Sequence, residues 1–477
     1  MRLLASPLLR WGGLLVIVLL LFASLGLKRR GAAEISLLQP LPQDPQIQAY
    51  FNHSQAAAYT EPYRQTYRLG DDLEQVVLDG IEAAQVSIDL AVQELNLPRL
   101  AAALRKKHQA GVRVRIILEN SYRRPLSQLN PSEVKQLDQR GRRKYQDFVR
   151  FVDQNQNGQL EPSEIAARDA VFMLQAAKVP LRDDTADGSK GSGLMHHKAL
   201  IIDGRTVIMG SANFTWSEMH GDFSSPASQG NANHLLRIES PALAQLFTQE
   251  FSLMWGGEIY SRATSRFGLQ KPYRPAQTIR LSPTSQVTVQ FSPTSRRLPW
   301  SQSVNGLIGR SLSQAKRTID LALFVFSEQQ LSNLLEAKHR QGVQVRALIE
   351  PSFAYRDFSE ALDMLGVALP NSRCRSEANN RPWKAPITTV GVPQLPEGDL
   401  LHHKFGIIDG QTVVTGSQNW SDAANSNNDE NLLVIHNPTV AAHFEREFER
   451  LYGNATLGLS ATLQARIQQH QQRCRSV

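Results

Sequence analysis

Two distant stretches of the chain repeat one pattern of apolar and polar positions. The first begins at Ala83 (AAQVSIDLAVQELNLPRLAAALRKKHQAGVRVRIILENS) and the second near Leu312 (LSQAKRTIDLALFVFSEQQLSNLLEAKHRQGVQVRALIEPS). In both, an apolar run of strand length precedes a segment of helical periodicity that closes at Gly111 or Gly342, and a second β-rich run follows. Strand, helix and strand in this order predict a mostly parallel sheet covered by helices.

A second shared pattern closes each of these regions. The segments LLRIESPALAQLFTQEFSLMW, from Leu235, and LLVIHNPTVAAHFEREFERLY, from Leu432, each predict a strand, a Pro turn and an amphipathic helix. We therefore expect two repeats, at residues 46–260 and 286–458, of which the first carries an insertion at about residues 125–170. The remaining parts are a Pro/Gln-rich spacer at 34–45, a linker at 261–285 and a basic tail at 459–477.

Residues 1–33 have the pattern of a membrane segment. The 17 residues from Trp11 to Leu27 carry no charge and are flanked by Arg and Lys on both sides. This length is at the lower limit for crossing a bilayer and slightly long for a signal-peptide core. We expect an uncleaved anchor that holds the protein on the membrane, on its extracytoplasmic side, with a cleaved signal and secretion as the alternative. Positive charge on both flanks leaves the orientation open.

The length and composition are those of a globular protein with more than one domain. The chain has 477 residues, of which 41% are hydrophobic and 20% charged, and this suits two domains of ordinary size. A net charge of +8 favours phosphate-bearing partners such as nucleic acid or anionic lipid, although a generally basic surface explains it equally well. Only Cys374 and Cys474 are present, which excludes a disulfide scaffold and leaves open whether these two residues pair.

One motif, H-x-K-x4-D-x6-G-S-x-N, occurs in both repeats. Six fixed positions recur by chance on the order of once in 10⁷ to 10⁸ starts, so two copies are not a coincidence. The candidate catalytic residues of the motif are His196, Lys198, Asp203 and Asn213 in the first repeat and His402, Lys404, Asp409 and Asn419 in the second. The candidate phosphate-binding residues are Gly210, Ser211, Gly416 and Ser417.

The spacing of the motif suits displacement at phosphorus. On a strand, residues i and i+2 share a face, so each histidine projects beside its lysine. The Asp-Gly pair then predicts a hairpin turn that returns the chain, with its Gly-Ser, to the same strand end. One imidazole can act as the nucleophile and the other, protonated, as the acid, while the Lys and Asn donors stabilise the phosphoryl oxygens without a metal. The aspartates fit a role in fixing the turn better than a role in the chemistry.

These paired motifs resemble the HKD motifs of the phospholipase D superfamily, and the resemblance covers nearly all of the chain beyond its first forty-odd residues. It implies an α/β fold of two tandem α-β-α sandwich repeats, related by a pseudo-twofold axis, with both motifs facing one shared cleft. It also implies a phosphohistidine intermediate, for which we expect His196 as the nucleophile and His402 as the acid and base. Members carry a downstream acidic residue that orients a catalytic histidine; Glu430 matches it, whereas the first repeat has Asn233 there and Asp222 nearby.

The resemblance leaves the substrate open. We expect hydrolysis of phospholipid head groups, with a metal-independent endonuclease acting on DNA or RNA as the alternative. Phosphatidyl transfer of the cardiolipin-synthase type is a weaker alternative, because that branch usually has two N-terminal spans. A non-catalytic binding module is the weakest, because neither motif is degraded. Since both motifs lie in one chain, we expect a monomer.

The insertion contains a segment that resembles an EF-hand calcium loop. DQNQNGQLEPSE, residues 153–164, has oxygen-bearing side chains and a glycine at the positions that such a loop requires. The alternative interpretation is an Asx-rich turn. We expect Ca²⁺ here to brace the insertion or gate the cleft and to take no part in catalysis. The candidate ligands are Asp153, Asn155, Asn157, Gln159, Glu161 and Glu164.

Overall fold

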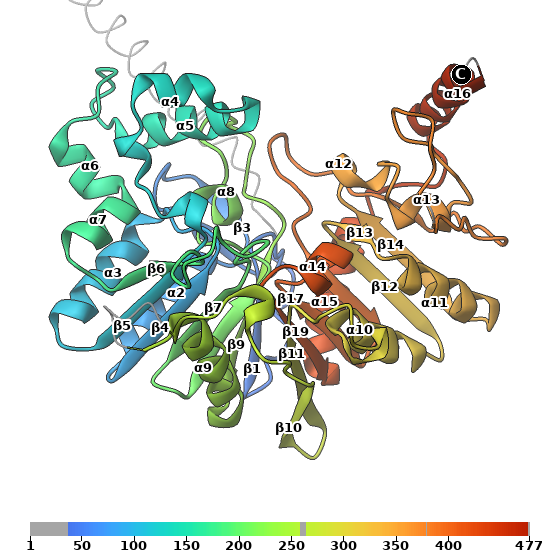
Figure 1. Cartoon of the computed structure of the whole chain (residues 1–477), viewed down its shortest axis with the longest axis horizontal. Helices are drawn as coiled ribbons and strands as arrows, with labels where there is room; N and C mark the ends of the chain where they lie inside the picture. Colours follow the sequence, from blue (N-terminus) through green and yellow to red (C-terminus); the bar gives the residue numbers. More distant parts are fainter. Residues whose placement is uncertain (1–36, 258–263, 378, 476–477) are drawn as a thin grey trace, which may run out of the picture.

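The computed structural model describes residues 37–257, 264–377 and 379–475, which form two large β-sheets, with helices on both faces of each, and two small two-stranded sheets (Figure 1). The first sheet belongs to the first repeat and has seven strands. In spatial order these are β1 (Ile47–Phe51), β9 (His234–Glu239), β8 (Thr206–Gly210), β7 (Lys198–Ile202), β4 (Ser87–Val92), β5 (Arg113–Leu118) and β6 (Leu181–Asp183).

The second sheet repeats this order and adds one strand at each edge. Its nine strands are β10 (Gln277–Ser282), β11 (Ser285–Phe291), β19 (Asn431–His436), β17 (Thr412–Gly416), β16 (Lys404–Ile408), β12 (Thr318–Leu323), β14 (Gln344–Ile349), β15 (Val390–Val392) and β20 (Thr456–Leu457). The edge strand β10 lies within the interval that the sequence assigns to the linker. Strands β1 and β11 thus occupy equivalent places, as do all pairs up to β6 and β15.

Both sheets are mixed, and the expectation of a mostly parallel sheet is wrong. Only β4, β5 and β6, and their counterparts β12, β14 and β15, run parallel; the other neighbours are antiparallel. The cause is the turn after β7, where Asp203 and Gly204 both have positive φ (51° and 61°). Two successive residues in this region make the tight turn of a two-residue hairpin, so β8 returns beside β7. Asp409 and Gly410 do the same after β16.

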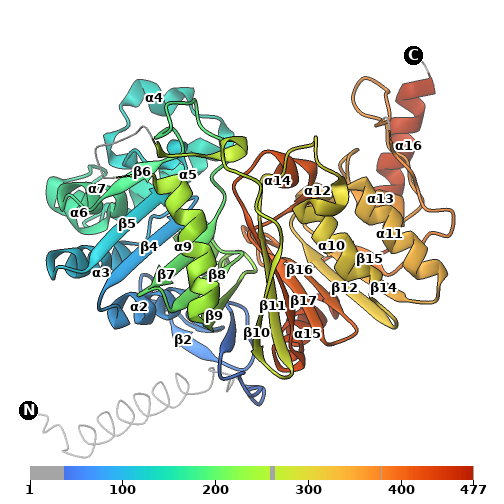
Figure 2. The same cartoon turned by 60° about the horizontal axis from the view of Figure 1, so that its bottom comes forward.

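Helices cover the outer face of each sheet. In both views they flank the pair of sheets, which stand side by side at the centre (Figures 1 and 2). On the first sheet they are α2 (Leu73–Ala83), α3 (Pro98–Gln109) and α7 (Ala170–Ala176); on the second they are α10 (Val304–Ser313), α11 (Gln329–Arg340) and α13 (Glu360–Met364). Their apolar stripes bury the outward-facing residues of the strands, such as Leu200 and Ile208 in the first repeat and Leu321 in the second.

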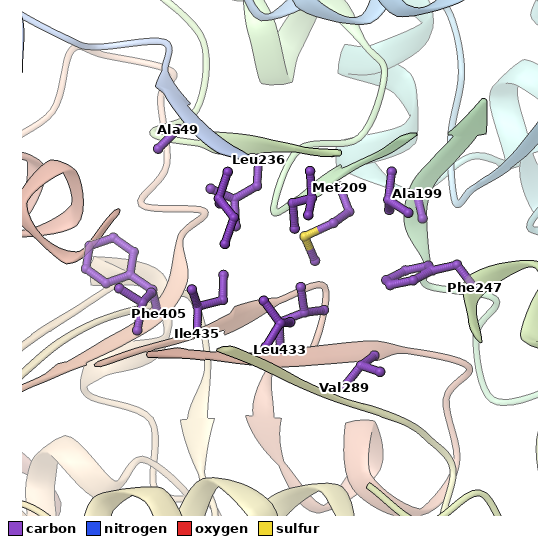
Figure 3. Close-up of a cluster of buried hydrophobic side chains, with 14 of the residues drawn as sticks. Ala49, Ala199, Met209, Leu236, Phe247, Val289, Phe405, Leu433 and Ile435 are labelled. Carbon is purple, nitrogen blue, oxygen red and sulfur yellow. The ribbon is translucent and has the colours of Figure 1, made fainter. Parts of the chain in front are cut away.

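The two repeats share one core between the sheets. The inward-facing residues Met209 and Leu236 of the first sheet lie opposite Leu433 and Ile435 of the second (Figure 3). The helices α9 (Pro241–Trp255) and α15 (Pro438–Tyr452) complete this layer, one from each repeat. Because apolar area removed from water is the main stabilising contribution, the repeats stabilise each other through this common core.

The insertion of the first repeat follows β5 and contains short helices. These are η1 (Asn120–Tyr122), η2 (Leu126–Gln128), α4 (Pro131–Gln136), α5 (Gln139–Val152) and α6 (Pro162–Arg168).

The predicted membrane segment, Trp11 to Leu27, lies outside the described residues. Within the portion that is described, no helix is long and apolar enough to cross a bilayer.

Cys374 and Cys474 form a disulfide. It joins the loop after α13 to the C-terminal helix α16 (Ala461–Arg475), which also inserts Leu463 into the core of the second repeat. The two cysteines are 100 residues apart, so the bond closes a long loop. A cross-link of that span mainly restricts the unfolded chain, which stabilises the folded state.

We expect the double replacement Cys374→Ser and Cys474→Ser to lower the free energy of unfolding by about 2–4 kcal/mol. Denaturant unfolding of the wild type with and without reductant measures this, with the double variant as the reference that reductant leaves unchanged. Equal stability of the oxidised and reduced wild type would contradict the stabilising role of the bond.

Candidate active site

The two motif histidines lie at matching ends of the two sheets. His196 and His402 precede β7 and β16, at the edge where β4 and β12 end, and they are 6% and 5% exposed. The low exposure places both imidazoles in a largely desolvated site. We call the rim of the two sheets that carries them the catalytic edge.

Each histidine is held by the backbone of the other repeat. The amide of His196 donates to the carbonyl of Asp429 (2.9 Å), and the amide of His402 donates to the carbonyl of Ala232 (3.1 Å). Two isolated parallel β-bridges, Met195 to Asp429 and Ala232 to Leu401, also link the two repeats. Neither half of the site is therefore complete within its own repeat.

Glu430 contacts His196 across the same boundary. Its Oε2 lies 2.7 Å from Nδ1 of the imidazole and also accepts a hydrogen bond from the Ser417 hydroxyl (2.7 Å). Burial lowers the pKa of His196 to about 4, against the opposing effect of Glu430. Burial raises the pKa of Glu430, but the attraction of His196 and Lys198 is larger, and the net shift is downward. This places Glu430 where the sequence expects an orienting carboxylate.

The corresponding partner of His402 is Glu218, which the sequence reasoning missed. Glu218 Oε2 lies 3.0 Å from Nδ1 of His402, and the side-chain oxygen of Asn233 lies 3.1 Å from the same nitrogen. Asn233 also donates to Glu218 through its amide nitrogen. Asp222, the suggested substitute, accepts a hydrogen bond from Ser217 instead and contacts neither histidine.

The two repeats carry the carboxylate that contacts a motif histidine at different positions. Glu218, five residues after the motif asparagine, stands where the second repeat has Ala424, while Asn233, directly before β9, stands where the second repeat has Glu430 directly before β19. Glu218 lies on the short helix α8 (Trp216–Met219), and Glu430 directly precedes β19. A position-by-position comparison of the repeats reveals this difference from the sequence alone. The first repeat lacks the acidic residue that the second has at Glu430, but it has Glu218 where the second has Ala424.

Both motif lysines are completely buried at the site. Lys198 donates to the carbonyl of His196 (3.0 Å) and Lys404 to that of His402 (2.8 Å). Burial lowers the pKa of Lys198 to about 8, and burial together with repulsion from Lys198 lowers the pKa of Lys404. Lys198 thus contributes to the electrostatic environment of Lys404, a residue of the other motif. An added phosphate would relieve the repulsion between the two ammonium groups.

The phosphate-binding candidates line the same strand ends. The hydroxyls of Ser211 and Ser417 donate to Asn233 and Glu430, the residues next to the imidazoles. A Cβ on Gly210 would lie 2.1 Å from the carbonyl oxygen of His234, so only glycine allows the neighbouring strand this close; Gly416 meets Asn431 in the same way. The side-chain oxygens of Asn213 and Asn419 are buried and contact no hydrogen-bond partner among the described residues. An amide oxygen only accepts hydrogen bonds, so a phosphoryl oxygen would be bound through the amide nitrogens of these residues, of which that of Asn213 donates to Glu218 (3.3 Å).

Asp203 and Asp409 lie away from the motif histidines. Each is seven residues from its histidine, at the far end of a five-residue strand, and a separation of more than roughly 20 Å follows from the rise of a strand. The carboxylate of Asp203 accepts from the amides of Gln85, Val86 and Ser87 (2.7–2.9 Å), and Asp409 binds the equivalent amides in the second repeat. These hydrogen bonds lower the pKa of both carboxyl groups. Both aspartates fix the turn and the start of the neighbouring strand.

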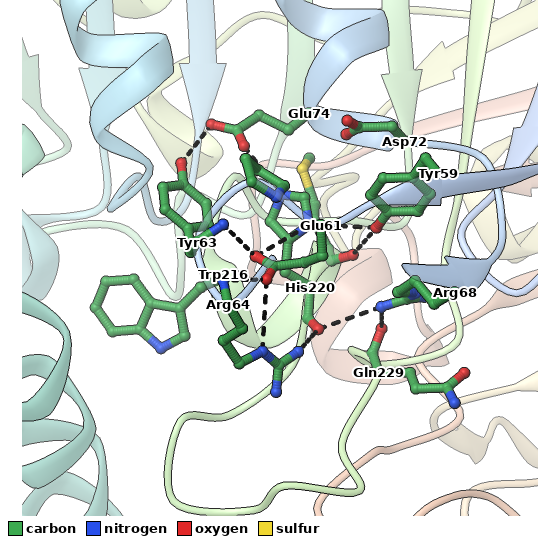
Figure 4. A network of polar contacts seen from close by, with 12 residues as sticks. Tyr59, Glu61, Tyr63, Arg64, Arg68, Asp72, Glu74, Trp216, His220 and Gln229 are labelled. Carbon is green, nitrogen blue, oxygen red and sulfur yellow. Dashed lines mark hydrogen bonds and ion pairs between the residues drawn. The ribbon is translucent and has the colours of Figure 1, made fainter. Parts of the chain in front are cut away.

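A buried polar network holds α8 and therefore Glu218 in place (Figure 4). His220, which follows α8, places Nε2 2.9 Å from Glu74, and its carbonyl accepts hydrogen bonds from Arg64 and Arg68. Glu74, Glu61 and His220 are completely buried. Since a buried charge is costly without partners, this network is rigid and fixes the end of the helix.

The predicted calcium loop lies between α5 and α6. Asp153 accepts hydrogen bonds from the amides of Asn157 and Gly158, and Glu164 accepts from those of Gln154 and Asn155. The loop therefore closes on its first and last carboxylates. No group of three or more His, Cys, Asp or Glu side chains is gathered as a metal site anywhere in residues 37–257, 264–377 and 379–475. Calcium binding stays a prediction.

Comparison with known proteins places both repeats in a common family. A family model described as "Cardiolipin synthase, PLD-like domain" matches residues 77–255 and 308–452. The mitochondrial cardiolipin hydrolase of Mus musculus is 30% identical over 157 residues, and that of Homo sapiens is 29% identical over 157 residues. Each match covers 32% of this chain, and the chain spans 61% of the mouse protein and 53% of the human one.

A solved structure shares the whole fold. The phosphatidylserine synthase of Haemophilus influenzae Rd KW20 aligns with a TM-score of 0.53 at 11% sequence identity. The alignment covers 89% of this chain and 90% of the synthase chain. At this identity the match supports the two-repeat fold alone.

We expect Glu218→Gln to lower kcat for a model phosphodiester by about 10²-fold with little change in KM. The amide cannot stabilise protonated His402, so the pKa of this histidine falls and the alkaline limb of the kcat profile moves to lower pH. Rates for bis(p-nitrophenyl) phosphate across a pH series measure both effects. Asp222→Asn is the matched control and leaves rate and profile unchanged; a profile that Glu218→Gln does not move contradicts the positioning role.

For the predicted calcium loop, we expect saturating Ca²⁺ to raise the thermal midpoint of the protein. At a hundredfold excess over Kd the added stability is about 2.7 kcal/mol. Thermal unfolding with Ca²⁺ and with chelator measures the difference, and Glu164→Gln removes it while leaving the midpoint in chelator near that of the wild type. Identical midpoints of the wild type in both conditions would leave the loop as an Asx-rich turn.

Proposed function

Because the chain belongs to the PLD-like family described as cardiolipin synthase, PLD-like domain, we propose that it is a phosphodiesterase that hydrolyses phospholipids at the head-group bond. The observation that carries this proposal is the paired imidazoles. Each has its Nδ1 held by a carboxylate of the opposite repeat, and no described residue forms a hydrogen bond with either Nε2. Two free Nε2 atoms beside two buried ammonium groups suit attack at phosphorus and protonation of a leaving oxygen.

In the proposed reaction, Nε2 of His196 forms a bond to phosphorus as the bond to the head-group oxygen breaks. His402 donates a proton to that oxygen, and the alcohol leaves. A water molecule then attacks the phosphohistidine and gives its proton to His402, and the phosphorus–nitrogen bond breaks. Lys198, Lys404, Asn213 and Asn419 stabilise the charge on the phosphoryl oxygens in both steps, without a metal.

The printed names of the mouse and human relatives support a lipid substrate, and cardiolipin is the first candidate. The disulfide supports an extracytoplasmic location, because such bonds persist in oxidising compartments. The apolar segment at residues 11–27 supports attachment to the membrane that holds the substrate. Both motifs lie in one chain, so we propose a monomer.

The name of the family model favours a second candidate, phosphatidyl transfer to an alcohol. The first step is the same, and the two activities differ only in whether water or an alcohol attacks the phosphohistidine. Adding glycerol to an assay with phosphatidylcholine separates them, because transfer yields phosphatidylglycerol and hydrolysis yields phosphatidic acid.

We expect the protein to release head groups from cardiolipin or phosphatidylcholine, and His196→Asn and His402→Asn each to reduce this by at least about 10³-fold. Parallel assays with the two labelled lipids and single-stranded DNA measure the substrate class. Asp203→Asn is the control for the motif, since it alters the turn and leaves the imidazoles in place. Cleavage of DNA alone, lost in both histidine variants, would instead make this protein a nuclease.

The intermediate tests the proposed roles. With His402→Asn, a phosphatidyl group labelled at phosphorus is expected to stay on His196, because the remaining histidine attacks but water is not activated. If the phosphorus label stays on the His196→Asn variant and is absent from the His402→Asn variant, His402 is the nucleophile and His196 is the acid and base.

A further inference from the structure

Positive charge is concentrated in two parts of the chain. The insertion arm, residues 120–152, has eight Arg and Lys against three Asp and Glu, a net of +5. The tail arm, residues 371–384 with 461–475, has seven against one, a net of +6. Residues 1–36 have a net charge of +4. Because the whole chain has a net charge of +8, all residues outside these three parts together have a net charge of −7. The basic character of the protein therefore belongs to the arms and the N-terminal segment and not to its body.

The insertion arm lies at the catalytic edge. Lys144 of α5 forms an ion pair with Glu94, which follows β4 where that strand ends beside Lys198. The ammonium of Lys144 also lies 4.3 Å from the centre of the Tyr122 ring. The side chains of Lys135, Arg140 and Arg143 are exposed and form no ion pair with a described residue.

The tail arm lies at the same edge on the other repeat. The amide of Arg381 donates to Gln329 at the start of α11 (3.1 Å), which follows the end of β12. The disulfide fixes the end of α16 to the loop that contains Arg373 and Arg375, and Arg466 projects from the same helix. In Figure 1, α4 and α5 lie on one side of α8, α14 (Asp422–Ser426) and α12 (Pro351–Ala354), and α16 lies on the other; Figure 2 shows the same arrangement about α14 and α12.

Exposed leucines accompany the histidines between the arms. Leu194, two residues before His196, is 36% exposed, and its carbonyl accepts from the amide of Asp429. Leu269 is 59% exposed, and the preceding Gly268 donates to the carboxylate of Asp429 (2.9 Å). Both leucines thus border the residue whose carbonyl holds His196.

From this arrangement we propose that the catalytic edge, with its two basic arms, is a docking face for the surface of an anionic phospholipid bilayer. The proposal rests on the phospholipid substrate proposed above. Arg and Lys near an anionic surface each contribute about 1 kcal/mol, and apolar side chains between them enter the interface. A nucleic acid needs a continuous basic track, whereas here the arms are separated by the leucines and by Glu94.

The test uses the full chain with Leu269→Cys, labelled with an environment-sensitive fluorophore after the native disulfide has formed. The protein is added to vesicles of phosphatidylcholine alone or of phosphatidylcholine with phosphatidylglycerol. We expect fluorescence to rise with the anionic vesicles only and to fall again at high salt, because exposed charges are screened.

Two triple variants remove the arms in turn: Lys135→Glu, Arg140→Glu and Arg143→Glu in the insertion arm, and Arg373→Glu, Arg375→Glu and Arg466→Glu in the tail arm. Each is expected to reduce the ratio of docked to free label about 10²-fold. The matched control is Lys106→Glu, Lys316→Glu and Arg340→Glu, three exposed positions just before β5, β12 and β14 and therefore at the opposite edge. The control keeps the full response.

Fluorescence that does not depend on anionic lipid, or that both arm variants retain, would overturn the docking face. Binding of labelled single-stranded DNA that the arm variants lose, without any response to vesicles, would overturn it too and assign the arms to nucleic acid. Measuring docking and hydrolysis together in the wild type separates the proposals. A wild type that docks without any lipid hydrolysis refutes the proposed function alone, whereas hydrolysis of a soluble short-chain lipid without docking refutes the surface alone.

Discussion

The site depends on a reciprocal exchange between the two repeats. Each motif imidazole is held at Nδ1 by a carboxylate of the opposite repeat, at 2.7 Å for His196 and 3.0 Å for His402, and each backbone amide donates to a carbonyl of that same repeat. An imidazole needs this fixed second partner to present the other nitrogen in a defined direction. Neither half alone has the parts, so the shared core between the sheets is a condition for the chemistry as well as for stability.

Burial of the motif side chains shifts their pKa values and makes their charged forms energetically unfavourable. The histidines and lysines of the motifs are nearly or completely removed from water, which lowers the pKa of all four. Two buried ammonium groups that repel each other are unfavourable until an anion binds between them. The surrounding polar contacts, including those of Glu74 with His220 and Arg99, fix the segment that carries Glu218.

Local patterns predicted much of this structure. The periodicity at Ala83 and Leu312 predicted β4, α3 and β5 and their counterparts, and the Asp-Gly pair predicted the hairpin after each motif. The motif itself predicted His196, Lys198, His402 and Lys404 at one edge. The antiparallel pairing of β4 with β7 and of β1 with β9 was missed, because these strands pair through contacts distant in sequence. Glu218 was missed because its role depends on a histidine 184 positions away, and no local pattern carries that information.

The different positions of Glu218 and Glu430 in the two repeats bear on how the repeats diverged. If the halves descend from one duplicated unit, they began with the same residue at the positions of Asn233 and Glu430. A chain with neither carboxylate would leave His402 without a charged partner, whereas a chain with both, at 218 and 233, keeps one at every step. If that shared residue was glutamate, a gain of the acidic residue on α8 before the loss at position 233 is the order that keeps a carboxylate beside His402. Asn233 now donates to Glu218 through its own amide, so the two positions depend on each other.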